Sequence, residues 1–93
     1  MYDRVLKKMR EKIRIRQYVM TLHAEEEMSN DNLSIFDVES CILSGNITQR
    51  QKDTATSEWK YLVKGHTLEG DNVTIVGKLS LTEKLVIITL FRE

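Results

Sequence analysis

The sequence predicts an α+β fold in which helices cover one face of a twisted antiparallel sheet. Three observations lead to this prediction. The first part of the chain, to residue 45, carries apolar residues at helical spacing together with helix-capping residues. From residue 46 onward, short runs with alternating apolar and polar residues are separated by turn residues. With 93 residues, no proline and no internal repeat, the chain is expected to form a single domain, residues 1–93.

The N-terminal segment is predicted to be a helix followed by a short strand. Val5, Met9 and Ile13 recur at helical spacing, which predicts a helix over about residues 2–13. The residues that follow, about 14–20, are predicted to form a short strand.

Two further helices are predicted, each with a polar cap. Thr21 is the expected N-cap of the first of them, and the turn-forming residues 29–32 are expected to close it. Ser34 and Asp37 have the spacing of a capping box at the start of the next helix. Gly45 is expected to end that helix in the left-handed conformation, which glycine adopts without strain.

The rest of the chain predicts an antiparallel meander of three or four strands, because the runs are short and closely spaced. Gly77 lies inside one run and is expected to mark a bulge or a close backbone approach. The expected strands are ITQRQKD, EWKYLVKG, VTIVGKLSL and LVIITLF, residues 47–53, 58–65, 73–81 and 85–91. The chain is thus divided into a basic N-terminal helix and strand, an acidic helical pair and a β-meander, residues 1–16, 21–45 and 46–93.

The formal net charge of zero conceals an asymmetry along the chain. Residues 1–18 hold seven basic and two acidic side chains, whereas residues 19–45 hold six acidic side chains and no Lys or Arg. Such a basic segment either binds a polyanion or is the solvated face of a helix whose charges complement the acidic block.

Several classes of protein are disfavoured by composition. The single cysteine, Cys41, excludes an internal disulfide and a cysteine-based zinc cluster, and its helical position predicts a buried apolar role. No apolar run is long enough to span a membrane, and the N-terminus lacks the apolar core of a secretion signal. The sequence has neither a P-loop nor a dinucleotide fingerprint. We therefore expect a cytoplasmic protein with no cofactor, no metal and no membrane partner.

His23 lies at the start of the predicted acidic helix and leaves three interpretations open. As a structural residue, it would bond to the strand end or to Glu26 or Glu27. As a functional residue, it would act as a general base or contact a phosphate, because an imidazole titrates near ~6.5. A metal site is the weakest interpretation, because His23 and Glu27 provide only two of the ligands that catalytic zinc needs.

The predicted strands also carry lysines that all lie on one face. Alternation places Lys60 and Lys64 opposite Trp59 and Tyr61, and Lys78 on the same side as the other lysines. These lysines either keep an open sheet face soluble or hold phosphates. Trp59 and Tyr61 are expected to belong to the core.

Several segments together resemble a widespread bacterial family of small domains of unknown function. Its members carry His-Ala at a helix start, a Met five residues after that His, an IS-x-x-DVE helix and a terminal apolar strand. The resemblance covers about residues 17–92. That family is grouped with RelE-like toxins, near the BrnT and MqsR types, and its genes commonly neighbour a small zinc-finger or helix-turn-helix antitoxin. The segments that carry the resemblance are HAEEEM, LSIFDVESCILSGNI, WKYLVKG, VTIVGKLS and LVIITLF.

This resemblance implies a RelE-like fold and a metal-independent mRNA endoribonuclease that transfers the phosphate to the 2′-hydroxyl, with or without the ribosome. The implied partners are RNA and a cognate antitoxin protein. Cationic groups and acid–base groups suit this chemistry because cleavage builds negative charge on the phosphate. The candidate catalytic residues are His23, Lys60, Tyr61 and Lys78, and the candidate RNA-binding residues are Arg14, Arg16 and Lys64.

The chain differs from that family at Asp31, where members often carry Arg, and in its neutral charge. An alternative function therefore stays open, namely a non-catalytic protein-binding module on the same fold. In that case the acidic block 25–39 and the apolar sheet edges would dock a partner encoded by an adjacent gene.

Overall fold

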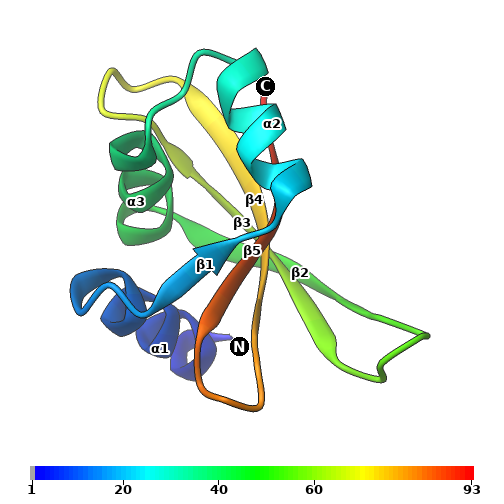
Figure 1. The fold of residues 1–93 in the computed structure, drawn as a ribbon. Helices are drawn as coiled ribbons and strands as arrows, with labels where there is room; N and C mark the ends of the chain where they lie inside the picture. The colour runs from blue at the N-terminus through cyan, green and yellow to red at the C-terminus, as the bar shows by residue number, and fades with distance from the viewer. Residues whose placement is uncertain (1) are drawn as a thin grey trace.

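The computed structural model describes residues 2–93, which form a mixed α+β fold with a five-stranded sheet (Figure 1). The strand order is β1-β5-β4-β3-β2, in which β1 is parallel to β5 and the other pairs are antiparallel. The prediction of an α+β fold with an antiparallel meander is confirmed. The elements are α1 (Asp3–Arg14), β1 (Tyr18–Met20), α2 (Leu22–Asn30), α3 (Ile35–Ser44), β2 (Asn46–Lys52), β3 (Trp59–His66), β4 (Asn72–Leu79) and β5 (Leu85–Arg92).

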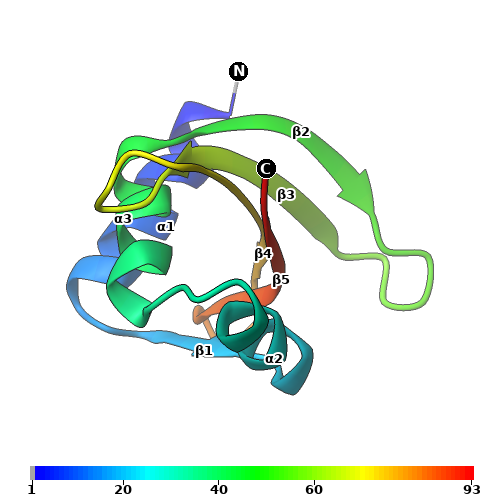
Figure 2. The same ribbon diagram turned by 90° about the horizontal axis from the view of Figure 1, so that it is seen from above.

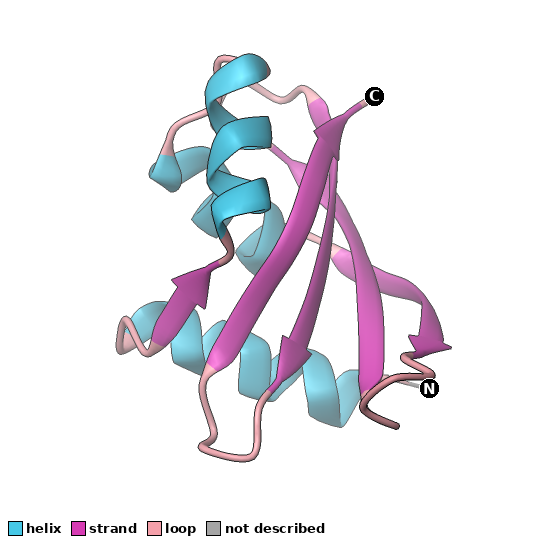
Figure 3. Cartoon of the chain, turned by 45° about the vertical axis from the view of Figure 1, so that its right-hand side comes forward, coloured by secondary structure: helices cyan, strands magenta, loops and turns pink. Residues whose placement is uncertain are grey.

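The sheet is strongly curved, and α1 and α3 lie within its hollow (Figure 2). Helix α3 packs on β3 and β4, while α2 continues from the short strand β1 and lies against β5 (Figure 3). The opposite face of the sheet carries no helix in any of the views.

The core lies between the helices and the inner face of the sheet. The alternation along the strands turns apolar residues of β3, β4 and β5 toward the helices, as the sequence predicts. The buried side chains of the sheet are Val63, Val73, Ile75, Leu85, Ile87 and Leu90, and those of α1 and α3 are Leu6, Met9, Ile13, Val38, Cys41 and Ile42.

Helix α1 is longer at its end than predicted, so the expected strand over 14–20 is wrong in its first half. The Arg16 amide donates to Ile13 O at 3.2 Å, and the Gln17 amide donates to Lys12 O at 2.9 Å. Arg16 has a φ of 58°, the left-handed conformation that commonly ends a helix. Helix-type turns therefore continue to Gln17, and β1 is left with only three residues.

The predicted caps of α2 and α3 are present. The Thr21 hydroxyl accepts from the Ala24 amide at 3.1 Å and donates to Ile88 O at 2.7 Å, which joins the helix start to β5. Ser34 and Asp37 form the reciprocal bonds of a capping box. This network lowers the pKa of the Asp37 carboxyl, chiefly because its carboxylate accepts from the Ser34 amide.

Gly45 does not adopt the left-handed conformation that the sequence predicts, since its φ is −90° and its ψ is −178°. Its role is instead to allow a close approach between α3 and β3. A Cβ at Gly45 would lie 2.5 Å from both Cys41 O and Lys64 O, and one at Gly65 would lie 2.1 Å from Cys41 O. Both glycines are therefore required by the packing of helix backbone on strand backbone.

The irregularity predicted at Gly77 is confirmed. The β4–β5 register shifts there, because Val76 pairs with Thr89 while Gly77 pairs with Ile87. Ile88 is thus the extra residue of a bulge, and its carbonyl is the one that accepts the Thr21 hydroxyl.

Candidate nucleic-acid interface

Strands β2 and β3 extend past the helices as a projecting ribbon (Figures 1 and 2). We call residues 49–61 the hairpin arm. Its turn is ordered by backbone hydrogen bonds, from the Asp53 amide to Glu58 O at 2.8 Å and from the Ser57 amide to Asp53 O at 2.7 Å. On the inner face of the arm, the side chains of Arg50, Lys52 and Trp59 are exposed to solvent.

A tryptophan flanked by two cations occupies this inner face. The Arg50 guanidinium carbon lies 4.0 Å from the centroid of the Trp59 ring, and Lys52 Nζ lies 5.8 Å from it, which are cation–π contacts. In the strand register, Lys52 pairs with Trp59 and Arg50 pairs with Tyr61, so all four side chains share one face.

Trp59 is 39% exposed, so the expectation that it belongs to the core is wrong. Trp59 is the first residue of β3, in the part of the β2–β3 ribbon that extends past the helices (Figure 2). A sequence signal does exist, because Arg50 and Lys52 alternate in β2 as Trp59 and Tyr61 alternate in β3. Arg50 and Lys52 were not among the predicted functional residues.

Tyr61 lies where the arm meets the core. Its side chain is half-buried and packs against the core, and its ring meets Tyr2 edge-on at 6.1 Å between centroids. Of the predicted catalytic residues, Tyr61 is the one that shares a face with Arg50 and Trp59.

The three predicted lysines lie on the outer face of the sheet, as expected from alternation. Leu62 pairs with Val76 and Lys64 pairs with Thr74, which places Lys60 and Lys78 on the same face as Lys64. Tyr61 therefore points to the side of the sheet opposite Lys60 and Lys78.

Carboxylates neutralise two of these lysines. Lys78 Nζ lies 3.6 Å from Glu58 Oε2, and Lys64 Nζ lies 3.5 Å from Glu93 Oε1. The Thr74 hydroxyl also donates to Glu93 Oε1 at 2.8 Å, and this bond is the main reason that the pKa of Glu93 is lowered. Among residues 2–93, Lys60 is the lysine of this group without an ion pair.

His23 is exposed on the first turn of α2, and within residues 2–93 its ring has no hydrogen-bond partner. Helix α2 contacts β5, which is separated from β3 by β4. The structure therefore does not bring His23 together with Lys60, Tyr61 or Lys78. In the part of the chain that the structure describes, no group of three His, Cys, Asp or Glu side chains could hold a metal ion.

Arg14 and Arg16 lie at the C-terminal end of α1 and are exposed. The other end of this 12-residue helix is the one beside Tyr61, through Tyr2. Because an α-helix rises ~1.5 Å per residue, the two arginines lie about 18 Å along the helix from the arm. They therefore do not belong to the arm.

Cys41 is fully buried, as predicted, and burial raises the pKa of its thiol to about 12. Such a thiol stays protonated and is not a nucleophile. Within residues 2–93, no helix is both long and apolar enough to cross a membrane.

Fold and surface together define a small α+β domain whose sheet projects an arm that carries cations and aromatic rings. Residues 20–92 match the family described as "Domain of unknown function (DUF4258)", and the chain belongs to this family. No curated protein and no solved structure matches the chain. The predicted membership of a family of domains of unknown function is confirmed, and α1 lies outside the matched residues.

Proposed function

We propose that this protein is an RNA-cleaving toxin of a toxin–antitoxin pair, built on a RelE-like fold. The resemblance of its sequence to that group supports this, together with an α+β architecture of the expected order. The proposed protein acts in the cytoplasm on mRNA, free or on the ribosome, and needs no metal. Its proposed inhibitor is an antitoxin of the zinc-finger or helix-turn-helix kind.

The observation that carries the proposal is the Arg50–Trp59 contact on the uncovered face of the arm. Single-stranded RNA is held by aromatic rings that stack on bases and by cations that neutralise phosphates. Trp59 offers such a ring, and Arg50 and Lys52 offer the cations beside it. Because the chain has no net charge, this local concentration of positive charge is what would attract RNA.

The proposed chemistry is attack of the ribose 2′-oxygen on the adjacent phosphorus. The O2′–P bond forms as the 2′-hydroxyl proton passes to solvent water, and the P–O5′ bond breaks, which leaves a 2′,3′-cyclic phosphate and a 5′-hydroxyl. The Arg50 guanidinium would steady the charge that builds on the phosphate, and the Tyr61 phenol, opposite it in the register, would protonate the departing 5′-oxygen.

The other predicted residues lie on other surfaces. Lys60 and Lys78 would contact phosphates only if the RNA passes around the edge of the arm to the outer face. His23 would take part only if the RNA extends to α2. Single alanine variants of these three residues distinguish two arrangements. They leave cleavage unchanged if the site is confined to the arm, and they lower it if the RNA follows a longer path around the sheet.

The test is a cleavage assay with a mixed-sequence RNA in EDTA, with and without ribosomes. We expect the wild type to cleave, and Arg50→Ala or Tyr61→Phe to lower the rate by about 100-fold, the usual cost of losing one charge-stabilising group or one general acid. Trp59→Ala should weaken RNA binding by about 10-fold, as the loss of one stacked base predicts. Lys84→Ala is the matched control, because Lys84 is an exposed cation in the turn between β4 and β5.

Absence of cleavage by a folded protein in both conditions would refute the nuclease and favour the non-catalytic binding module. Cleavage that is lost in His23→Ala but retained in the arm variants would move the site from the arm to α2.

A further inference from the structure

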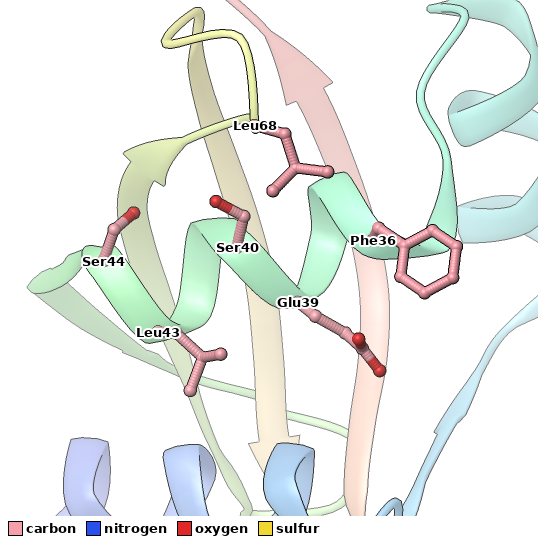
Figure 4. Close-up of a pocket in the computed structure, with 6 residues that line it drawn as sticks. All are labelled: Phe36, Glu39, Ser40, Leu43, Ser44 and Leu68. Carbon is pink, nitrogen blue, oxygen red and sulfur yellow. The ribbon is translucent and has the colours of Figure 1, made fainter.

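An open groove of about 410 Å³ runs along the surface of α3 (Figure 4). One wall is made by α3 side chains at helical spacing, and the other is made by Leu68, which hangs from the loop between β3 and β4. The lining residues are Phe36, Glu39, Ser40, Leu43, Ser44 and Leu68.

Apolar side chains of this groove are exposed, and the loop that carries one of them is fixed to α3. Phe36 is 57% exposed and Leu68 is 69% exposed. The Leu68 amide donates to Asp37 Oδ1 at 3.1 Å, and the Gly70 amide donates to Thr67 O at 3.0 Å. The loop is therefore fixed to α3 by hydrogen bonds, so Leu68 is presented to solvent by an ordered backbone.

A carboxylate lies at the edge of this apolar surface. Glu39 Oε2 accepts a hydrogen bond from the Tyr18 hydroxyl, which holds the carboxylate in one orientation. Within residues 2–93, Glu39 makes no ion pair. The second oxygen, Oε1, is in no hydrogen bond of the described residues and can accept from an incoming donor.

The surroundings set the sign of the charge that this surface attracts. Residues 19–45, which include α2 and α3, contain six carboxylates and no Lys or Arg. Arg10 of α1 donates to Ile42 O and Gly45 O at the C-terminal end of α3, so the attraction for cations is local to Glu39. At that point of the groove the carboxylate attracts a cationic group and repels an acidic one. A partner with both apolar and basic side chains therefore complements the groove in both respects.

We propose that the α3 groove binds a basic amphipathic helix of another protein, whose apolar side chains pack on Phe36, Leu43 and Leu68 and whose Lys or Arg pairs with Glu39. A helix laid in a groove places apolar anchors at i, i+3 or i+4 and i+7, which matches the spacing of Phe36 and Leu43 along α3. This docking surface is separate from the arm and does not depend on RNA cleavage.

The test uses a synthetic amphipathic helical peptide made of leucine and lysine, and a second peptide in which glutamate replaces lysine. Binding to the full-length chain is measured by fluorescence anisotropy, and the contact surface is mapped by amide NMR shifts. We expect saturable binding of the lysine peptide, with shifts at Phe36, Leu43 and Leu68, and no measurable binding of the glutamate peptide.

Variants with matched controls separate the groove from general attraction to an acidic protein. Leu68→Ser should weaken binding by about 10-fold, because a leucine anchor is lost, while Leu81→Ser, at a leucine that is 96% exposed in the β4–β5 turn, should not. Glu39→Gln should weaken it by about threefold, while Glu83→Gln, at an exposed carboxylate in the β4–β5 turn, should not. Glu39→Lys should admit the glutamate peptide. The thermal midpoint of each variant verifies that it is folded.

Equal losses in the groove variants and their controls would overturn the proposal, as would equal binding of both peptides or shifts confined to the arm. A concentration-dependent dimer that Leu68→Ser dissolves would also overturn it, because the occupant would then be a second copy of this chain.

Discussion

The helix-covered part of the sheet and the hairpin arm share strands β2 and β3 but differ in what lies on their inner face. Under the helices, the side chains of Val63 and Ile75 are at most 1% exposed. On the arm, Trp59 lies on the same face of β3 as Val63, yet it is 39% exposed and has Arg50 beside it. One strand thus passes from core to open surface within a few residues.

The difference shows that alternation specifies which side a residue faces, whereas the extent of the helices decides whether that side is buried. Apolar burial under the helices supplies the free energy of folding, at roughly 25 cal/mol per Å². The arm contributes little burial, so its inner face is free to carry charge. Stability and the proposed RNA binding are therefore assigned to different ends of the same strands.

The largest effect is expected for a core truncation. Ile75→Ala should lower the free energy of unfolding by about 3 kcal/mol, because a fully buried side chain is replaced by a cavity. Trp59→Ala should lower it by less than about 1 kcal/mol, since the ring is already partly solvated. Urea denaturation of both variants measures this contrast.

If Trp59→Ala destabilised the fold as much as Ile75→Ala, the arm would be part of the core and the comparison would fail. A Trp59→Phe variant keeps an aromatic ring of smaller size. Its comparison with Trp59→Ala separates the effect of removing the ring from the effect of making it smaller.

The next effect concerns the close approach of α3 to β3. Gly65→Ala should cost about 1–3 kcal/mol, because its new Cβ would lie 2.1 Å from Cys41 O and the helix must shift. Gly77→Ala is the control within the sheet, since its Cβ would meet Val86 O at 3.3 Å and needs only a small adjustment. Thermal unfolding midpoints compare the two, and equal shifts would mean that helix–strand contact is not the constraint.

The sequence predicts the fold wherever a local rule acts alone. The N-caps at Thr21 and Ser34 depend on neighbouring backbone groups, and both are present. At Gly45 the sequence predicts a left-handed helix end, whereas the residue is glycine because α3 approaches β3 closely, and no local pattern in the sequence reveals that contact. The end of α1 was placed too early, because Arg16 takes a conformation more typical of glycine.

The candidate site was predictable in part. Alternation correctly separates Lys60 from Tyr61, but only the three-dimensional arrangement shows that Trp59, at the start of β3, is exposed. The separation of His23 from the other candidate residues also follows from the strand order. His23 lies on the helix after β1, and β1 pairs with β5, although the two strands are far apart in sequence.

A smaller effect is expected at the capping box of α3, in the helix-covered region. Ser34→Ala should cost about 1 kcal/mol through loss of the cap. The pKa of Asp37 is lowered in the folded state, so its stabilising contribution is present above its ordinary pKa and lost as the pH falls through the folded value. The acid side of the stability profile should therefore be less steep in Ser34→Ala. An unchanged profile would mean that the Ser34 hydroxyl does not contribute to the shift.

The smallest effect is expected at Tyr18, which links β1 to α3 through Glu39. Burial, and then its hydrogen bond to Glu39, raise the pKa of Tyr18 from its ordinary 10.0 to about 12. A folded-state pKa above the unfolded value means that this contribution is complete below pH 10 and is lost as the pH rises toward 12. Tyr18→Phe should be less stable than the wild type by about 1 kcal/mol near neutral pH, and the difference should shrink across that alkaline interval. Denaturation at several pH values, with tyrosine ionisation followed by ultraviolet absorbance, measures both. A stability difference that stays constant with pH would show that the bond to Glu39 does not depend on the phenol proton. A stability difference that shrinks would assign Tyr18 to the helix-covered part of the sheet, which stabilises the fold, and not to the solvated arm.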